Sequence, residues 1–269
     1  MSEINEGVPT DITAYSYALE GRDGSQHPAK FFKMDRPISE MPQSELAKMV
    51  PQVVDVAKRC FTHWTDNGER FRKIVTERAN RLSLVFDETG ENVVAFNVYE
   101  QNPLELDGVE GPVDMVYTHY AGVDPKPTAT GATHRGQGLM ESSRTHDTQT
   151  MNPDVISGCT AAGAILKGVR ATAKELGRQM YPDIDKPLPP SVGKLGRAIY
   201  TKLNDETVGA SVDTNTLVRH GKSEYLRGVA TDPLQALLAT NNDAILYTSL
   251  SPTFAQKIGV APAAAPVVK

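Results

Sequence analysis

The sequence is poor in cysteine and contains no long apolar run. Of its 269 residues only Cys60 and Cys159 are cysteines, which is too few for a disulfide framework and gives no metal-site spacing. No run of about 18 apolar residues occurs, so we expect no membrane-spanning helix. Residues 1–10 are polar and acidic and lack the apolar core of a signal peptide. These absences predict a cytoplasmic protein with reduced thiols.

The sequence also contains fewer basic than acidic residues. The 28 Lys and Arg residues are outnumbered by 33 Asp and Glu residues, which leaves a formal net charge of −5. Nucleic-acid binding needs concentrated Lys and Arg to neutralise phosphates, so we expect no nucleic-acid partner. The six histidines are dispersed without His-x-x-x-His spacing, so no metal site is predicted.

The length suits one large domain or two small ones. Hydrophobic residues make up 39% of the chain and charged residues 23%, which is ordinary for a protein with a sizeable core. We expect an N-terminal arm over residues 1–43 and a main domain over 44–255 with an insertion near 183–212. The Ala- and Pro-rich residues 256–269 are expected to form a flexible tail.

Hydrophobic periodicity predicts an α/β protein. Apolar residues at three- and four-residue steps predict helices over 44–64, 69–80, 162–180 and 192–203, with a more polar helix over 139–151. Shorter apolar runs predict strands over 82–86, 93–99, 113–123, 154–159, 213–227 and 243–250. Pro51 is expected either to kink the first helix or to lie in its first turn.

A glycine-containing turn stands between the strand at 113–123 and the helix that begins near Leu139. It reads Thr133-His-Arg-Gly-Gln-Gly138. The first backbone N–H groups of a helix lack partners inside the helix, and its dipole adds positive charge there. Gly136 and Gly138 carry no side chain and would let a diphosphate approach the backbone. The alternative is that the two glycines only tighten the turn.

Two common phosphate-binding motifs do not fit this turn. No Gly-Lys-Ser/Thr follows at Walker spacing, and the dinucleotide fingerprint would place Glu141 where a small residue is needed. The turn resembles the pyrophosphate loop of the GNAT superfamily, the GCN5-related N-acyltransferases. Thr133 departs from the Gln or Arg usual at the first position of that loop.

The order of predicted elements also resembles the GNAT fold. The resemblance implies a mixed, mostly antiparallel sheet flanked by helices, with the glycine turn between strand and helix. It implies transfer of an acyl group from acyl-CoA, by default acetyl-CoA, or from an acyl carrier protein through acyl-phosphopantetheine. The expected acceptor is a small-molecule amine that attacks directly in a biosynthetic or detoxifying reaction, without a metal. A non-catalytic CoA- or partner-binding module and a nucleotide-binding protein are the alternatives.

The resemblance implies a donor site built mostly from backbone groups. The residues that it assigns to the donor are Val123, His134, Arg135, Gly136, Gln137, Gly138, Leu139 and Met140. The connection 124–132 is longer than expected beside such a site. We interpret it as a lid, a mobile insert or an adaptation to an unusual donor.

Three residues are the first candidates for proton transfer, and a fourth is a second choice. His119 on the strand 113–123 is the first candidate for the base, because imidazole titrates near neutrality. Glu100 is the rival base, and the alternative for His119 is a structural histidine. Tyr181 matches the family's thiolate acid, although Pro182 follows it directly, and Tyr200 is the second choice. Cys159 is expected to be a buried, inert thiol. The final predicted strand, 243–250, would offer a sheet edge through which two copies of the protein could form a homodimer.

Overall fold

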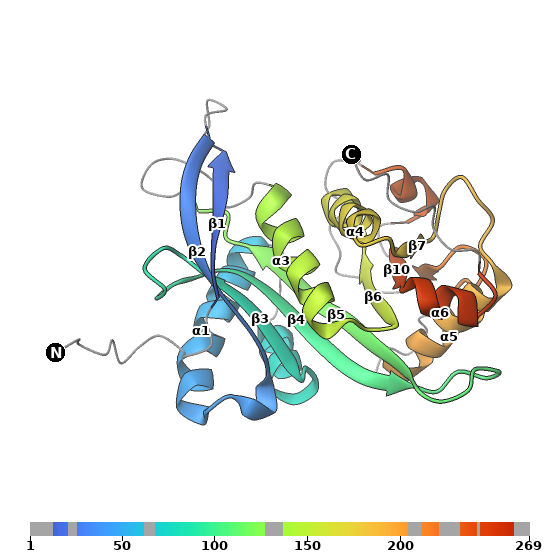
Figure 1. The fold of residues 1–269 in the computed structure, drawn as a ribbon, viewed down its shortest axis with the longest axis horizontal. Coiled ribbons are helices and arrows are strands. Elements are labelled where there is room, and N and C mark those ends of the chain that lie inside the picture. Colours follow the sequence, from blue (N-terminus) through green and yellow to red (C-terminus); the bar gives the residue numbers. More distant parts are fainter. Residues whose placement is uncertain are drawn as a thin grey trace. The chain divides into compact units, whose positions relative to one another are not determined.

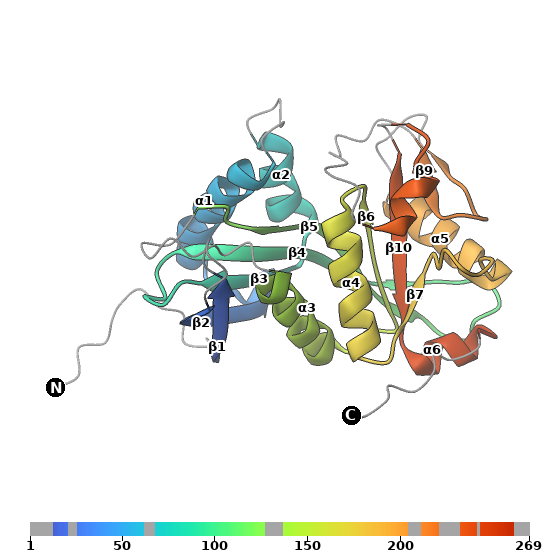
Figure 2. The same cartoon turned by 90° about the horizontal axis from the view of Figure 1, so that it is seen from above.

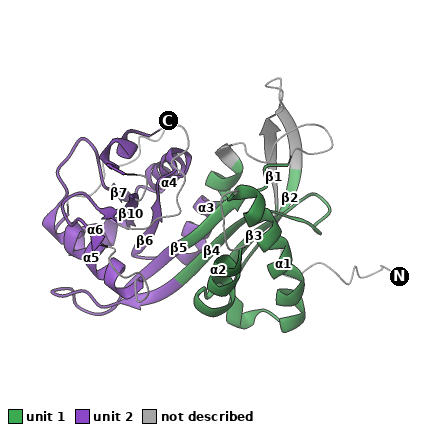
Figure 3. Ribbon diagram, turned by 180° about the vertical axis from the view of Figure 1, so that it is seen from behind, with its two compact units in different colours: residues 1–100, 119–143 green, residues 101–118, 144–269 purple. Residues whose placement is uncertain are grey.

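The computed structural model describes residues 13–20, 26–61, 68–126, 137–203, 211–220, 232–240 and 243–260. The chain forms two compact units (Figure 3). Unit 1 comprises residues 1–100 and 119–143, and unit 2 comprises residues 101–118 and 144–269. None of the helices in these described ranges has the length and apolar character needed to cross a membrane.

Unit 1 is built on antiparallel strands (Figure 1). The strands are β1 (Thr13–Glu20), β2 (Gln26–Pro37), β3 (Arg81–Phe86) and β4 (Val93–Leu104), with β5 (Val113–Val123) next to β4. β2 pairs with β3 so that Phe32 lies opposite Phe86. The strands β4 and β5 run on into unit 2.

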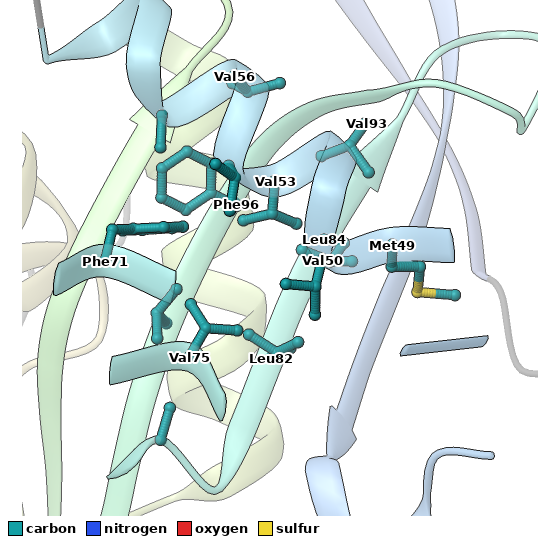
Figure 4. Close-up of a cluster of buried hydrophobic side chains, with 14 of the residues drawn as sticks. Met49, Val50, Val53, Val56, Phe71, Val75, Leu82, Leu84, Val93 and Phe96 are labelled. Atoms are coloured by element: carbon teal, nitrogen blue, oxygen red, sulfur yellow. The ribbon is translucent and has the colours of Figure 1, made fainter. Parts of the chain in front are cut away.

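One face of this sheet is covered by α1 (Gln43–Cys60), α2 (Glu69–Lys73) and the π-helical turn η2 (Ile74–Arg78) (Figure 2). A short 3-10 turn, η1 (Ile38–Glu40), precedes α1. Figure 4 shows the core beneath these helices. Its labelled side chains are Met49, Val50, Val53, Val56, Phe71, Val75, Leu82, Leu84, Val93 and Phe96. Pro51 lies inside α1, which begins well before it.

The opposite face of the unit 1 sheet is covered by the first turns of α3 (Gln137–Met151). Leu139 of α3 is fully buried against Phe31, Val85 and Val94 of the strands. Because this contact joins the start of the helix to three strands, it fixes the position of the first helical turn over the sheet.

In unit 2, β5 pairs in parallel with β6 (Val155–Thr160), from Met115 opposite Val155 to Thr118 opposite Gly158. The remaining pairs are antiparallel and centre on β10 (Ala244–Leu250). Its partners are β6, β7 (Gln179–Tyr181) and β9 (Val218–His220), and β8 (Ser211–Val212) pairs with β9. Helices cover both faces. They are α4 (Gly163–Glu175) with η3 (Pro233–Leu237), and α5 (Pro190–Leu203) with α6 (Pro252–Lys257).

The predicted fold class is confirmed, since a mixed, mostly antiparallel sheet is flanked by helices. The strand predicted at 113–123 and the helix predicted at 192–203 are close to β5 and α5. The prediction of a helix over 162–180 was wrong at its end, because Gln179–Tyr181 pair with β10 as β7.

The N-terminal region holds structure that periodicity did not predict. Within the segment expected to be an arm, β1 and β2 form a hairpin, and β2 extends the sheet beside β3. This hairpin supplies a strand ahead of the first helix, as the resemblance implies. The last residues of the helix predicted over 44–64 lie outside the described part of the chain.

Candidate functional site

The two rival bases of the sequence analysis lie together in unit 1. His119 Nε2 of β5 is 2.7 Å from Glu100 Oε2 of β4. Both side chains are largely withdrawn from solvent, with 8% of His119 and 11% of Glu100 exposed. With Glu100 ionised, its carboxylate accepts a hydrogen bond from Nε2–H, and Nδ1 is then the acceptor nitrogen of the ring. The two rival bases are therefore direct neighbours, joined by one short contact.

Arg78 at the end of η2 completes this group. Its Nη2 lies 3.8 Å from Glu100 Oε2, the same oxygen that faces His119. The sequence analysis did not single out Arg78, because it is one of several charged residues on a segment read as a polar helix. Neither spacing nor composition distinguishes it from Arg70 or Arg72.

Aromatic rings pack against Tyr120, which follows His119 on β5. The ring of Tyr120 lies 4.9 Å from that of Phe71 and 5.8 Å from that of Phe61, measured between centroids. Gly122 follows on the same strand. A Cβ there would approach Cys60 Sγ and the Phe96 ring to 2.9 Å, so the absence of a side chain lets the end of α1 reach β5.

The end of β5 is pinned to the end of α1 by polar contacts. Cys60 Sγ donates to the carbonyl oxygen of Val123 at 3.1 Å. Arg59 donates to both carboxylate oxygens of Asp124, from Nε at 3.0 Å and from Nη2 at 2.6 Å. Asp124 also accepts from the backbone N–H of Lys126 at 3.0 Å. These contacts fix the direction in which the chain leaves β5 toward the glycine turn.

The predicted donor residues fall into three groups. His134, Arg135 and Gly136 lie outside the described residues, as does most of the connection 124–132. Gln137 and Gly138 open α3. Leu139 is buried, Met140 and Val123 are partly buried, and all three belong to one apolar cluster. Their side chains therefore anchor the first turn of α3, and its backbone N–H groups are the groups that a diphosphate could contact.

A buried lysine ties α3 to the sheet further along the helix. Lys33 of β2 is only 3% exposed. Its Nζ donates to the carbonyl oxygen of Ser143 at 2.8 Å and to its Oγ at 3.1 Å. Asn97 of β4 donates to the same Oγ at 3.4 Å. The first turn of α3 contains no acidic residue, so the local charge is compatible with an anion.

The candidate thiolate acid, Tyr181, belongs to unit 2. It is 4% exposed, pairs through β7 with Thr248, and lies in an apolar cluster with Tyr117 and Val155. Burial and the Asp183 carboxylate raise the pKa of Tyr181, while a hydrogen bond with Gln179 opposes them. Its assignment as an acid stays a prediction.

Other polar side chains of unit 2 gather around Cys159. Burial raises the pKa of the Cys159 thiol, against the opposing influence of Arg219 and Tyr117. Arg219 also lies over the ring of Tyr200, 6.0 Å from its centroid. Within the described ranges, no three His, Cys, Asp or Glu side chains are grouped so as to hold a metal ion.

The sequence matches no known family model. It matches no curated protein. Solved structures with partial likeness include a GNAT family N-acetyltransferase from Escherichia coli in complex with CoA. Its identity is 15% and its TM-score 0.36, over 55% of this chain and 68% of that one.

Two further solved structures differ in how much of this chain they match. A yellow fever mosquito protein that carries the name arylalkylamine N-acetyltransferase 7 has 10% identity and a TM-score of 0.46, over 90% of this chain and 96% of its own. A conserved protein from Enterococcus faecalis has 12% identity and a TM-score of 0.35, and the match covers 55% of this chain and 32% of that longer one. Identities and TM-scores this low do not by themselves assign an activity.

Proposed function

We propose that the protein transfers an acyl group from an acyl thioester of CoA to the amine of a small molecule. The observation that carries this proposal is the His119–Glu100 pair at 2.7 Å, on the strand that leads into α3. A base on one strand and a helix N-terminus after the next turn provide a proton acceptor and an anion site on neighbouring stretches of chain.

The residues of α3 fit the anionic part of the donor. The helix begins at Gln137 and Gly138, whose backbone N–H groups lie in its first turn. Leu139 packs into the apolar cluster beneath the helix, and the first turn carries no carboxylate. His134, Arg135 and Gly136 are proposed to complete the contact. An acyl group on a carrier protein is the alternative donor, because its phosphopantetheine offers the same thioester.

The acyl thioester supplies an activated carbonyl carbon, and the protein's own groups handle protons and alignment. The amine nitrogen forms a bond to that carbon, the carbon–sulfur bond breaks, and sulfur leaves with the bonding electron pair. The hydrogen-bonded pair of His119 and Glu100 takes the proton that the amine nitrogen loses. Tyr181 is proposed to return a proton to the thiolate.

The donor site is tested by calorimetric titration of CoA and acetyl-CoA into the wild-type protein and a Gly138→Trp variant. We expect binding that the variant loses, because an indole in the first turn of α3 blocks access to the backbone. Binding that survives Gly138→Trp would move the donor away from α3. If CoA does not bind, an acyl carrier protein is titrated next, and failure of both donors contradicts the proposal.

The base is tested by thiol release from acetyl-CoA with a panel of amines. We expect His119→Gln to lower kcat/KM by about 100-fold or more while CoA affinity is retained. His146→Gln is the matched control, since His146 is an exposed histidine of α3. Equal rates for His119→Gln, Glu100→Gln and the wild type would favour a non-catalytic CoA- or partner-binding module.

A further inference from the structure

Unit 2 contains a buried arginine whose guanidinium group has no partner among the described residues. Arg144 lies in α3, and only 8% of it is exposed. In the described ranges, no carboxylate or other hydrogen-bond acceptor contacts its guanidinium group. Arginine is almost never buried unless it is paired, because withdrawing a charge from water without compensation is unfavourable. A guanidinium group at this depth is therefore suited to an anion that comes from outside the chain.

Another buried arginine of unit 2 shows how such a group is satisfied by the fold. Arg178 is 6% exposed. Its guanidinium group donates to Oγ of Ser249 at 3.2 Å and to the carbonyl oxygen of the same residue at 3.0 Å. It also donates to the carbonyl oxygens of Pro153 at 3.0 Å and Asp154 at 3.2 Å. These contacts explain why Arg178 is buried, and no comparable set surrounds Arg144 within the described part of the chain.

A second hydrogen-bond donor, the phenol of Tyr247, lies on the central strand of the same unit. Tyr247 belongs to β10 and is 3% exposed. It lies opposite Gly158 of β6, which in turn lies opposite Thr118 of β5. A Cβ at Gly158 would approach Tyr247 Cζ to 2.7 Å and the Thr118 carbonyl oxygen to 3.0 Å. The missing side chain of Gly158 thus lets the phenol cross β6 toward β5.

The charge of Arg144 reaches this phenol. Burial raises the pKa of Tyr247, whereas the charge of Arg144 and a hydrogen bond with Thr118 oppose the rise. The influence of a charge falls with distance, so the guanidinium group and the phenol lie close together. Tyr247 is protonated at neutral pH, and its O–H and the N–H groups of Arg144 are all donors.

The position of the two donors along the chain separates them from the expected diphosphate site. The pairing of β5 with β6 reaches Thr118 opposite Gly158, and His119, the candidate base, follows Thr118 directly. Along α3, Arg144 comes two turns after Gln137, or about 10 Å at the rise of an α-helix. A diphosphate at the first turn is too far away to neutralise Arg144, so Arg144 requires a second negative group.

We propose that Arg144 and Tyr247 bind a carboxylate carried by one of the two substrates, either on the acyl group of the donor or on the amine acceptor. A carboxylate can accept two parallel hydrogen bonds from a guanidinium group and still has a lone pair for a phenol. The inference rests on the proposed function for the identity of the substrates. Anion binding itself needs neither donor nor acceptor, so it is tested separately.

The binding test follows the thermal unfolding of the protein with and without succinate. Without succinate, we expect Arg144→Met to unfold at a higher temperature than the wild type, because an unpaired buried charge is removed. Succinate should raise the midpoint of the wild type and leave that of Arg144→Met unchanged. Arg178→Met removes a buried arginine that has partners and should unfold at a lower temperature. Arg197→Met, at an exposed position of α5, should behave as the wild type does.

The kinetic test locates the carboxylate. Values of kcat/KM are compared for succinyl-CoA and butyryl-CoA, which have equally long acyl chains, and for a panel of amino acids and their amides as acceptors. The substrate that carries the bound carboxylate should be preferred by about 10- to 100-fold, as expected for hydrogen bonds to a charged group. Arg144→Met should abolish this preference, Tyr247→Phe should reduce it, and Arg197→Met should retain it.

The outcomes separate this proposal from the proposed function. An Arg144→Met variant that is less stable than the wild type and still responds to succinate would show that Arg144 is structural, and the carboxylate site would fall. Acyl transfer whose substrate preferences do not change in Arg144→Met would also overturn the site and leave the proposed function intact. If the succinate effect depends on Arg144 but no acyl transfer is detected, the proposed function falls and the anion site remains.

Discussion

Side-chain contacts hold the end of β5, and Asp124 makes several of them. Burial opposes its ionisation, but hydrogen bonds from Arg59 and from the Lys126 backbone N–H outweigh burial and lower the pKa of Asp124. A carboxyl group whose pKa is lowered by folding stabilises the folded state above its unfolded value of 3.8. That contribution is lost as the pH falls through the lower folded value.

The Asp124→Asn variant is therefore expected to lose about 2 kcal/mol of unfolding free energy at pH 7. The difference from the wild type should shrink below about pH 4, where the wild-type carboxyl group also becomes neutral. Urea titrations at several pH values measure it. Glu91→Gln, at an exposed turn position, is the control and should show no such loss. A difference that stays constant down to pH 2 would contradict the assigned ion pair.

The residues of the candidate site were predictable one by one, but their grouping was not. His119 and Glu100 were each found from their chemistry and their place on a strand. The sequence presented them as rivals, because each could serve as a base and nothing local placed them together. Only the pairing of neighbouring strands brings their side chains to 2.7 Å.

Among the elements, α5 shows most clearly how packing depends on small residues. Gly193 faces the turn before β9, and a Cβ there would clash with the carbonyl oxygen of Thr214. That atom belongs to the backbone and cannot rotate away. The helix must therefore lift from the turn if any larger residue replaces Gly193.

We expect Gly193→Ala to destabilise the protein by about 1–3 kcal/mol, although alanine favours helices more than glycine does. Lys194→Ala, one position along and exposed, should be close to neutral. The midpoints of thermal or urea unfolding measure both variants. A Gly193→Ala variant as stable as Lys194→Ala would show that the turn gives way without cost.

Helices and strands with a strong hydrophobic periodicity were predicted well. Elements that form because of pairing with distant strands were not. The strand 113–123 and the helix 192–203 carry their pattern in their own residues. In contrast, Gln179–Tyr181 become a strand because β10 offers free backbone partners. The π-helical turn η2 lies within the helix predicted over 69–80, and hydrophobic periodicity did not distinguish it from an α-helix.

At the scale of the whole molecule, the two units differ in how they use the chain. The described part of unit 1 needs residues from 119–143, which supply Tyr120, Val123 and Leu139 to its apolar clusters. Unit 2, in contrast, contains no residue before Gln101. A cut after Glu100 therefore removes essential residues from unit 1 only.

We expect the fragment 101–269 to show a cooperative unfolding transition and the fragment 1–100 to show none. The reason is that the fragment 1–100 exposes the apolar faces that β5 and α3 cover in the full chain. Circular dichroism during heating measures both fragments, with the full chain as reference. Cooperative unfolding of the fragment 1–100 would contradict this dependence.

The sequence by itself determined the fold class, the longer helices, about half of the strands and the chemical identity of the candidate base, because periodicity and residue chemistry are local properties. The tertiary structure alone decided that Glu100 and His119 form one group, that Arg78 lies beside Glu100, and that Thr13–Glu20 and Gln26–Pro37 join the sheet as β1 and β2. These features depend on strand register and on shared burial. Both arise only when segments distant in the sequence compete for the same partners.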